Sequence, residues 1–535
     1  MKEKRKILQS KPYLYLTEFF AGMSVMAVEL GASRLLAPYF SSSQIVWTII
    51  IGTIMIAMAL GNICGGKWAD KNPDPDRLYK RILIAAIWIA AIPVFGKYVI
   101  LAVSALFIFT VSSGFLVIAS FITCMVVFVF PLFLLGTVTP SLVKYTTDNL
   151  EENGKIVGFL GAANTIGSII GTFLPTFVTI PAVGTAITFL LFGGILLVLS
   201  ILYFVSGRTR KKTVIVSAVL FLLCCIFGHD SSFAFWESNL SYEGESVYNY
   251  LQVKEDDRMV ALSTNVLFGV QSVRMKQEEL TGLYYDYALA APYMASVPEN
   301  PDPAKILILG NGTGTYLSQC EKYFNDPEVE GVEIDEKISK LAETYFDLPK
   351  DAKVVTYDGR AYLNASKETY DVIMVDAYQD ITIPFQMSSL EFFSMVRDHL
   401  KENGVMVVNM NMRGQKAGSI TDYLSDTIHA VFPNVYTVDV PGSTNRELFA
   451  SQNKNLLTAF RDSYEKETRP DLNSMMKRVD AGLTAHVGEG RILTDDKAPV
   501  ELLGMLVIDE LIQDEVRFYK DIYETEGLEG ILNNL

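Results

Sequence analysis

The chain has 535 residues, half of them hydrophobic, and a formal net charge of −15. This length exceeds what one hydrophobic core normally serves and predicts at least two domains. Residues 1–229 contain 18 basic and 9 acidic residues, whereas residues 230–535 contain 27 basic and 51 acidic residues. So acidic a second part argues against nucleic-acid binding and suits a cationic substrate, although the same charge would also simply keep a domain soluble.

The first 229 residues predict an α-helical multi-span membrane domain. Most of its apolar runs are long enough to cross about 30 Å of hydrocarbon, which predicts about seven spans. The runs cover residues 13–37, 44–66, 82–103, 113–135, 157–180, 185–205 and 213–228. The first run follows several basic residues but lacks a small-residue cleavage site, so we expect a retained helix and not a signal peptide.

Basic residues between the runs predict the orientation in the cell membrane. They fill the loops at 67–81, 144–155 and 207–212. The positive-inside rule places these loops and the N-terminus in the cytoplasm. A seventh span at 213–228 would put the acidic part outside the cell, where nucleoside cosubstrates are not normally found. The side on which the acidic part lies therefore stays open.

Small and charged residues within the spans carry two further expectations. Two glycine pairs, Gly61 with Gly65 and Gly167 with Gly171, have the spacing that lets helices pack closely in lipid. We prefer this packing role to the alternative, a role in transport. Glu29 and Arg34 lie within or near the first span. They predict a structural ion pair, with a substrate path as the alternative.

The acidic part begins with a small antiparallel β-sheet over residues 230–300, predicted from alternating runs at 246–253, 259–262 and 269–274. A helix is expected at 283–290. Strands and helices then alternate as in a doubly wound, Rossmann-like α/β domain, which we assign to residues 301–535. Strands are expected at 305–309, 329–334, 352–356, 371–376, 404–410 and 434–440, with helices between them, for example at 336–346 and 388–400.

The end of this part predicts helices. Residues 461–478 are charged and read as helical, and an amphipathic pattern runs from residue 500 to about 523. Thr494 is expected to be a helix N-cap, with Asp495 and Asp496 in the first turn.

A glycine-rich turn is the strongest local signal in the chain. The apolar run Lys305–Leu309 ends in Gly310, Gly312 and Gly314, as where a buried parallel strand turns into a helix. Glycines let the backbone approach a ligand closely, and a helix N-terminus offers unpaired N–H groups. Glu333 follows at the end of the next strand, at a spacing that suits a carboxylate holding ribose hydroxyls. The combination predicts a nucleoside site.

Three acids stand at the carboxyl ends of successive strands, where ligands bind in such sheets. They are Glu333, Asp358 and Asp376. Each alone could be a loop acid or a helix cap. Together, around a glycine turn, they predict a ligand site. The five cysteines and four histidines show no metal-like or disulfide-like spacing, so no metal is expected.

The segments Gly310–Tyr316, Val332–Asp335, Asp358–Arg360 and Asp371–Asp376 together resemble the spermidine synthase family of aminopropyltransferases. The multi-span first part, together with Tyr248–Val253 and Leu493–Glu501, resembles the membrane-fused branch of that family. The resemblance covers most of the chain.

The resemblance implies a role for each matching residue on the donor side. Glu333 would hold the ribose hydroxyls, beside the turn of Gly310, Gly312 and Gly314. Asp358 with Gly359 would hold the adenine end. Asn249 and Gln271 would lie near the sulfonium chain.

On the acceptor side, the resemblance implies that Asp376 orients and deprotonates the attacking amine. Tyr284, Tyr285, Tyr378 and Asp380 would contact that amine. The implied activity is transfer of an aminopropyl group from decarboxylated S-adenosylmethionine to a putrescine-like amine, without a further cofactor. Such proteins are often homodimers.

Departures from the family pattern keep two alternatives open. Soluble members carry an Asp at the position of Thr313, where it helps to hold the amine end of the donor, and Asp380 is displaced by one position. One alternative is an S-adenosylmethionine-dependent methyltransferase, because the same sheet and Glu333 would serve both cosubstrates. The other is a non-catalytic polyamine sensor or transporter.

Overall fold

The computed structural model describes residues 10–534 except 41–42, 109–113, 147–152, 208–209, 230–231, 238, 267–268, 278, 301, 379–382, 412 and 415. The chain divides into two compact units. The helical unit comprises residues 1–236 and 244–250, and the α/β unit comprises residues 237–243 and 251–535.

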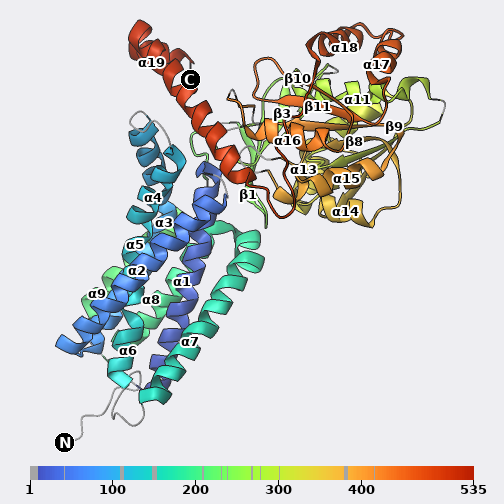
Figure 1. Ribbon diagram of the computed structural model, residues 1–535. Coiled ribbons are helices and arrows are strands. Elements are labelled where there is room, and N and C mark those ends of the chain that lie inside the picture. The colour runs from blue at the N-terminus through green and yellow to red at the C-terminus, as the bar shows by residue number, and fades with distance from the viewer. Residues whose placement is uncertain are drawn as a thin grey trace, which may run out of the picture. The chain divides into compact units, whose positions relative to one another are not determined.

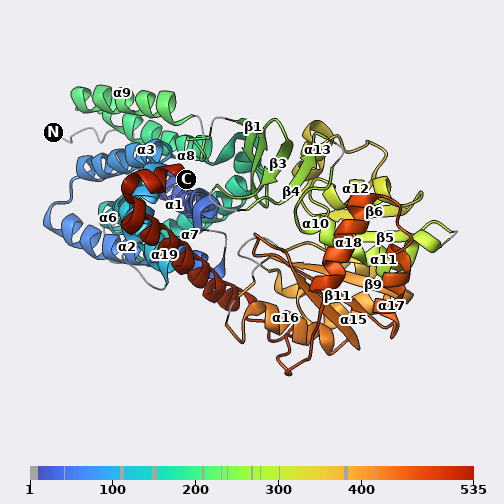
Figure 2. The same cartoon turned by 90° about the horizontal axis from the view of Figure 1, so that it is seen from above.

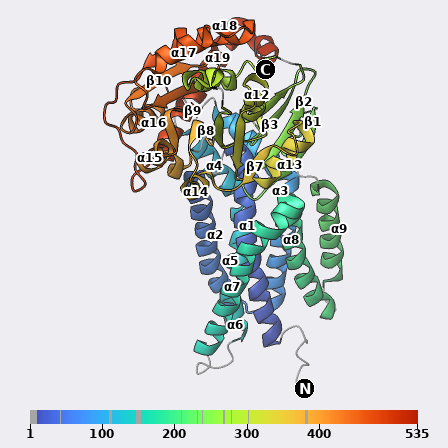
Figure 3. The ribbon, with the colours of Figure 1, turned by 90° about the vertical axis from the view of Figure 1, so that its right-hand side faces the viewer.

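The helical unit is a bundle whose helices run side by side in Figure 3. Its elements are α1 (Lys11–Phe40), α2 (Gln44–Lys71), α3 (Pro75–Ile108), α4 (Phe115–Val127), α5 (Val129–Gly136), α6 (Val138–Thr146), α7 (Asn153–Leu174), the π-helix η3 (Pro175–Thr179), α8 (Ile180–Ser206) and α9 (Lys211–Gly228).

Within the described residues, six helical stretches are long and apolar enough to cross a membrane. Seven spans were predicted, and the described residues contain six such stretches because two of the predicted runs are continuous. Two of the runs, 157–180 and 185–205, fall in one stretch of 54 residues from Asn153 to Ser206. Gly184 interrupts this stretch with a φ of 81°. A straight helix of that length would span about 80 Å, more than twice the hydrocarbon thickness.

Close helix packing in this unit depends on the predicted glycines. A Cβ atom on Gly167 or Gly171 of α7 would overlap the carbonyl oxygens of Phe19 and Met23 on α1. A Cβ atom on Gly61 would likewise overlap the carbonyl oxygen of Phe133. The packing role predicted for these spacings is confirmed.

Buried polar side chains also join these helices. Glu18 of α1 is fully buried, and its Oε1 accepts hydrogen bonds from Thr139 Oγ1 at 2.5 Å and Asn164 Nδ2 at 2.7 Å. Arg34 donates to the carbonyl oxygen of Val247. The pairing of Glu29 with Arg34 stays a prediction.

The smaller sheet is four-stranded with the order β1-β2-β3-β4. Its strands are β1 (Leu240–Glu245), β2 (Tyr250–Glu255), β3 (Met259–Ser263) and β4 (Ser272–Met275). The predicted strand at 246–253 is wrong at its start. Ser246 Oγ accepts from the N–H groups of Tyr248 and Asn249, as in a turn.

The larger sheet has eight strands in the order β12-β10-β11-β9-β8-β5-β6-β7. They are β5 (Lys305–Leu309), β6 (Glu328–Glu333), β7 (Lys353–Thr356), β8 (Tyr370–Val375), β9 (Leu400–Met410), β10 (Asn434–Asp439), β11 (Arg446–Ser451) and β12 (Thr484–Ala485). Strands β5 to β9 are parallel, and β10, β11 and β12 add on antiparallel. All six predicted strands are present. Strands β1, β11 and β12 were not predicted.

Helices cover both faces of the larger sheet. Figure 1 shows α11 (Ala290–Met294), α17 (Leu456–Tyr464) and α18 (Pro470–Gly482) on one side, and α14 (Gly359–Ala365) and α15 (Leu390–Asp398) on the other. The remaining helices are α10 (Tyr284–Ala288), α12 (Thr315–Tyr323), α13 (Glu336–Tyr345), α16 (Ile420–His429), α19 (Val500–Asn534) and the short η4 (Val297–Glu299) and η5 (Phe385–Met387). Figure 2 shows α10, α12 and α18 together from above.

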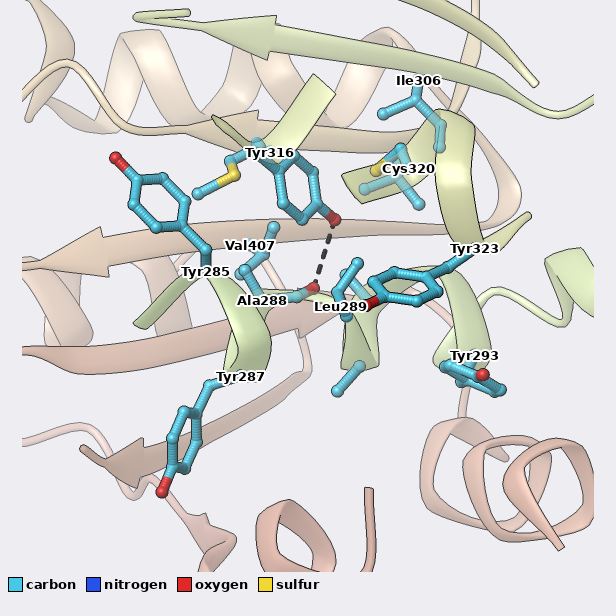
Figure 4. Close-up of a cluster of buried hydrophobic side chains, with 14 of the residues drawn as sticks. Tyr285, Tyr287, Ala288, Leu289, Tyr293, Ile306, Tyr316, Cys320, Tyr323 and Val407 are labelled. Carbon is cyan, nitrogen blue, oxygen red and sulfur yellow. Dashed lines mark hydrogen bonds between the residues drawn. The ribbon is translucent and has the colours of Figure 1, made fainter. Parts of the chain in front are cut away.

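The main core of the α/β unit lies under α10, α11, α12, α17 and α18. Figure 4 shows part of it, including Tyr285, Tyr316 and Val407, with the hydrogen bond from Tyr316 to the carbonyl oxygen of Ala288. The hydroxyl groups of Tyr316 and Tyr285 in this core donate to backbone carbonyl oxygens, which gives these buried groups the partner that they require.

Two predictions for the C-terminal region need correction. The helix expected at 461–478 is two helices, because Pro470 starts α18 and cannot continue α17. Thr494 is not an N-cap. Its N–H donates to the carbonyl oxygen of Lys497 in an isolated bridge, and α19 begins only at Val500.

Candidate active site

The glycine turn follows β5 as predicted, and Gly310 fixes its path. Gly310 has a φ of 93°, a conformation that side chains disfavour, and its N–H donates to the carbonyl oxygen of Val332 at 2.9 Å. A Cβ atom at this position would lie 2.5 Å from the carbonyl oxygen of Asp376. The turn therefore lies directly against the end of β8.

Glu333, at the end of β6, is bound to the same turn. Its Oε2 accepts from the N–H of Gly312 at 2.8 Å, and its Oε1 accepts from the N–H of Asp335 at 3.0 Å. Glu333 is buried. Desolvation raises the pKa of Glu333 to about 7, although these backbone hydrogen bonds act in the opposite direction.

Thr313 occupies the middle of the turn. Its N–H donates to Ser272 Oγ at 3.1 Å. Its own hydroxyl is buried and has no hydrogen-bond partner within the described part of the chain. Gly314 precedes α12 with a φ of 86°.

Asp358 is the N-cap of α14, where its Oδ1 accepts from the N–H of Ala361 at 2.7 Å. Gly359 is the first residue of that helix. The next residue, Arg360, forms a bidentate pair with Asp495, at 2.7 and 2.6 Å. The capping role and a ligand role for Asp358 are compatible, because a cap uses one carboxylate oxygen.

Asp376 follows β8 and is held by two donors. Tyr284 Oη donates to Asp376 Oδ2 at 2.8 Å, and Asn409 Nδ2 donates to Oδ1 at 2.9 Å. Asp376 is partly exposed at the surface. Desolvation, with a smaller contribution from the charge of Glu333, raises the pKa of Asp376 to about 7, although the hydrogen bonds from Asn409 and Tyr284 act in the opposite direction. Such a carboxyl group can take up a proton near neutral pH.

The structure brings Tyr284, Tyr285 and Gln271 together beside Asp376. The rings of the two tyrosines have centroids 4.0 Å apart, and Tyr285 Oη donates to the carbonyl oxygen of Gln271 at 2.6 Å. Burial raises the pKa of both phenols. Both hydroxyls therefore act as donors at physiological pH.

The structure does not test the ligand roles of the remaining predicted residues. Tyr378 Oη donates to the carbonyl oxygen of Met387 at 2.9 Å, so its hydroxyl proton is already used. Asn249 belongs to the helical unit. Asp380 lies outside the described residues. Their ligand roles stay predictions.

Sequence reasoning did not identify two polar residues of the site, Asn409 and Glu447. They face each other on β9 and β11 as a cross-strand pair. Asn409 stands near the end of a predicted strand, and that position was an available signal. Glu447 lies within a strand that was not predicted at all. Its burial is complete.

The chain matches the Spermine/spermidine synthase domain family over residues 290–458. It is 53% identical over 350 residues to a "Probable polyamine aminopropyl transferase" of Bifidobacterium longum, covering 62% of this chain and 77% of that relative. It is 26% identical over 303 residues to a "Polyamine aminopropyltransferase" of Vibrio vulnificus, covering 53% of this chain and 96% of the relative.

Among solved structures, a probable spermidine synthase from Corynebacterium glutamicum matches with a TM-score of 0.36 and 20% identity, covering 47% of this chain and 97% of that one.

Proposed function

The chain belongs to the polyamine aminopropyltransferase family and is an aminopropyltransferase; on this premise we propose that it transfers the aminopropyl group of decarboxylated S-adenosylmethionine to a putrescine-like amine. One observation carries the proposal. The backbone of Asp376 lies directly against a glycine turn that binds the Glu333 carboxylate, and Tyr284 and Asn409 hold the carboxyl group of Asp376.

We assign the donor to the glycine-turn side. Glu333 would accept hydrogen bonds from the ribose hydroxyls, because a carboxylate oxygen has lone pairs beyond those used by Gly312 and Asp335. Asp358 and Gly359 would contact the adenine, and Gln271 the sulfonium chain. The methyl and aminopropyl groups of the sulfonium would then face Asp376.

The reaction is a displacement at carbon. The lone pair of the acceptor nitrogen attacks the carbon bonded to the sulfonium sulfur, so a C–N bond forms and the C–S bond breaks. The electron pair of the C–S bond goes to sulfur, which leaves neutral methylthioadenosine. Asp376 takes the proton that the nitrogen loses. Its raised pKa suits this task at neutral pH, and the donors Tyr284 and Asn409 fix its orientation.

The acceptor would lie among Tyr284, Tyr285, Tyr378 and Asp380. We propose that the reaction needs no cofactor beyond its sulfonium donor.

We further propose that the helical unit lies in the lipid bilayer with the N-terminus in the cytoplasm, and that two copies of the chain associate as a homodimer. The six apolar helical stretches support the membrane assignment.

The experiment is a product assay with the full-length protein in detergent, given decarboxylated S-adenosylmethionine and putrescine. We expect methylthioadenosine and spermidine in equal amounts. Formation of S-adenosylhomocysteine from S-adenosylmethionine, with no methylthioadenosine from the decarboxylated donor, would establish the methyltransferase alternative. Binding of both ligands without any product would establish the sensor alternative.

A further inference from the structure

A second carboxyl group stands beside Asp376 without any hydrogen-bond partner. Glu447 of β11 has 0% of its surface exposed, and both of its carboxyl oxygens lack a partner among the described residues. Buried polar groups in native proteins are nearly always paired, so this exception needs a reason.

The sheet register directs Glu447 towards the catalytic carboxyl group. Glu447 is paired across the strands with Asn409, so both side chains lie on the same face of the sheet. Asn409 in turn donates to Asp376 at the end of the neighbouring strand β8. The three side chains thus follow one another across β8, β9 and β11.

Electrostatic coupling supports this placement independently of the register. Burial, and then the charge of Asp376, raises the pKa of Glu447 well above its ordinary range. Glu447 also acts electrostatically on Tyr316, whose hydroxyl donates to the carbonyl oxygen of Ala288 in the core (Figure 4). Glu447 and Asp376 are therefore electrostatically coupled as well as neighbours in the register.

Three kinds of group could explain the unpaired carboxyl of Glu447: an apolar packing contact, a metal ion or a ligand cation. A packing residue at this position would be apolar or would have a protein partner. A metal ion would require further ligands, and no group of three His, Cys, Asp or Glu side chains with suitable geometry occurs among the described residues. A primary ammonium group has three donors and no acceptor, which complements two carboxyl groups.

We propose that Glu447 binds a primary ammonium group of the substrates beside Asp376. The inference rests on the proposed function and adds to it a binding residue for the charged amine end. Two sources have this chemistry: the aminopropyl end of the donor, and the nitrogen of the acceptor that does not react.

The test compares three ligands by calorimetry on the full-length protein in detergent. Methylthioadenosine carries no ammonium group, decarboxylated S-adenosylmethionine carries one, and putrescine is added to the methylthioadenosine complex. In Glu447→Gln we expect methylthioadenosine affinity within twofold of the wild type. Affinity for one ammonium ligand should fall at least tenfold: for the donor if its aminopropyl end is bound, for putrescine if the acceptor is bound.

Glu330→Gln is the matched control, because Glu330 is also a buried acid of the same sheet but is paired with Lys353 at 2.9 Å. It should change neither ammonium affinity. Unchanged affinity for both ammonium ligands in Glu447→Gln overturns the inference. Glu447→Met provides a second variant, which removes the unpaired carboxyl group at similar volume. It should raise the melting temperature of the ligand-free protein and reduce ammonium affinity as Glu447→Gln does.

Loss of methylthioadenosine affinity in both variants would mean that Glu447 supports the fold, and would also overturn the inference. Wild-type turnover reports on the proposed reaction separately. An active wild type with unchanged affinities in both variants refutes only the role of Glu447. An inactive wild type whose amine affinity falls in Glu447→Gln refutes only the reaction.

Discussion

At the scale of single residues, Asp376 combines two properties that a general base needs. It is partly exposed, so a substrate can reach it, and its two donors fix the carboxyl plane. Replacing it with Asn preserves the shape and removes the proton acceptor. We expect Asp376→Asn to lower kcat by about 10²- to 10⁴-fold, the usual contribution of general acid–base catalysis, in a product assay.

The control for this variant is Asp371→Asn at the opposite end of the same strand, where Asp371 pairs with Lys401. It should keep kcat within a few-fold of the wild type. Methylthioadenosine should still bind to Asp376→Asn, which would show that the nucleoside side is intact. A kcat close to that of the wild type in Asp376→Asn would contradict the assigned role.

The raised pKa values of Glu333 and Asp376 also predict how stability depends on pH. Both are about 7 in the folded protein, against about 4 in an unfolded chain. The folded state therefore binds more protons than the unfolded state between about pH 4 and pH 7. The stability from these groups is fully present below about pH 4 and is lost as the pH rises from there through about 7.

Thermal unfolding of the ligand-free protein checks this expectation. The melting temperature should fall between pH 5 and pH 8, and it should fall less in Asp376→Asn, because one of the two groups no longer titrates. An equal fall in the wild type and the variant would mean that Asp376 does not titrate in this range.

At the scale of elements, the close contact between α1 and α7 requires glycine at positions 167 and 171, because a side chain there would overlap the backbone of α1. A methyl group on Gly167 would overlap the backbone of Phe19, whereas a methyl group on Gly161 of the same helix would meet nothing within 4 Å. We expect Gly167→Ala to destabilise the helical unit by about 1–3 kcal/mol, as overpacking does. Gly161→Ala should be neutral or slightly stabilising. Melting in detergent separates the two outcomes.

The same scale shows what the sequence could predict. Strand β5 was predictable because its apolar run ends in glycines, and Glu333 at the end of β6 because it stands at a regular spacing after that turn. β11 was not predicted, because its only apolar run is the three residues Leu448–Ala450, although Pro441 and Gly442 mark a turn before it. Glu447 was missed with it. The hydrogen bond from Tyr284 to Asp376 joins residues 92 positions apart, and no local pattern encodes it.

At the scale of the whole molecule, the apolar helical stretches and the basic N-terminus together predict how the protein is recovered from cells. It should stay in the membrane fraction after an alkaline carbonate wash and be released by detergent. A green fluorescent protein fused to the N-terminus should fluoresce, as expected in the cytoplasm. Release by carbonate would contradict the membrane assignment. A fusion that does not fluoresce although the protein is present in the membrane would contradict the orientation.

The raised pKa values of the Glu333 and Asp376 carboxyl groups have a thermodynamic consequence for ligand binding. Near pH 7 each carries a proton in part of the molecules, and a cationic ligand favours the molecules in which that proton has left. Hydrogen ions and the cationic substrate are then competitors for the same charges. Uptake of the substrate would acidify an unbuffered solution, and its heat of binding would change with the ionisation enthalpy of the buffer.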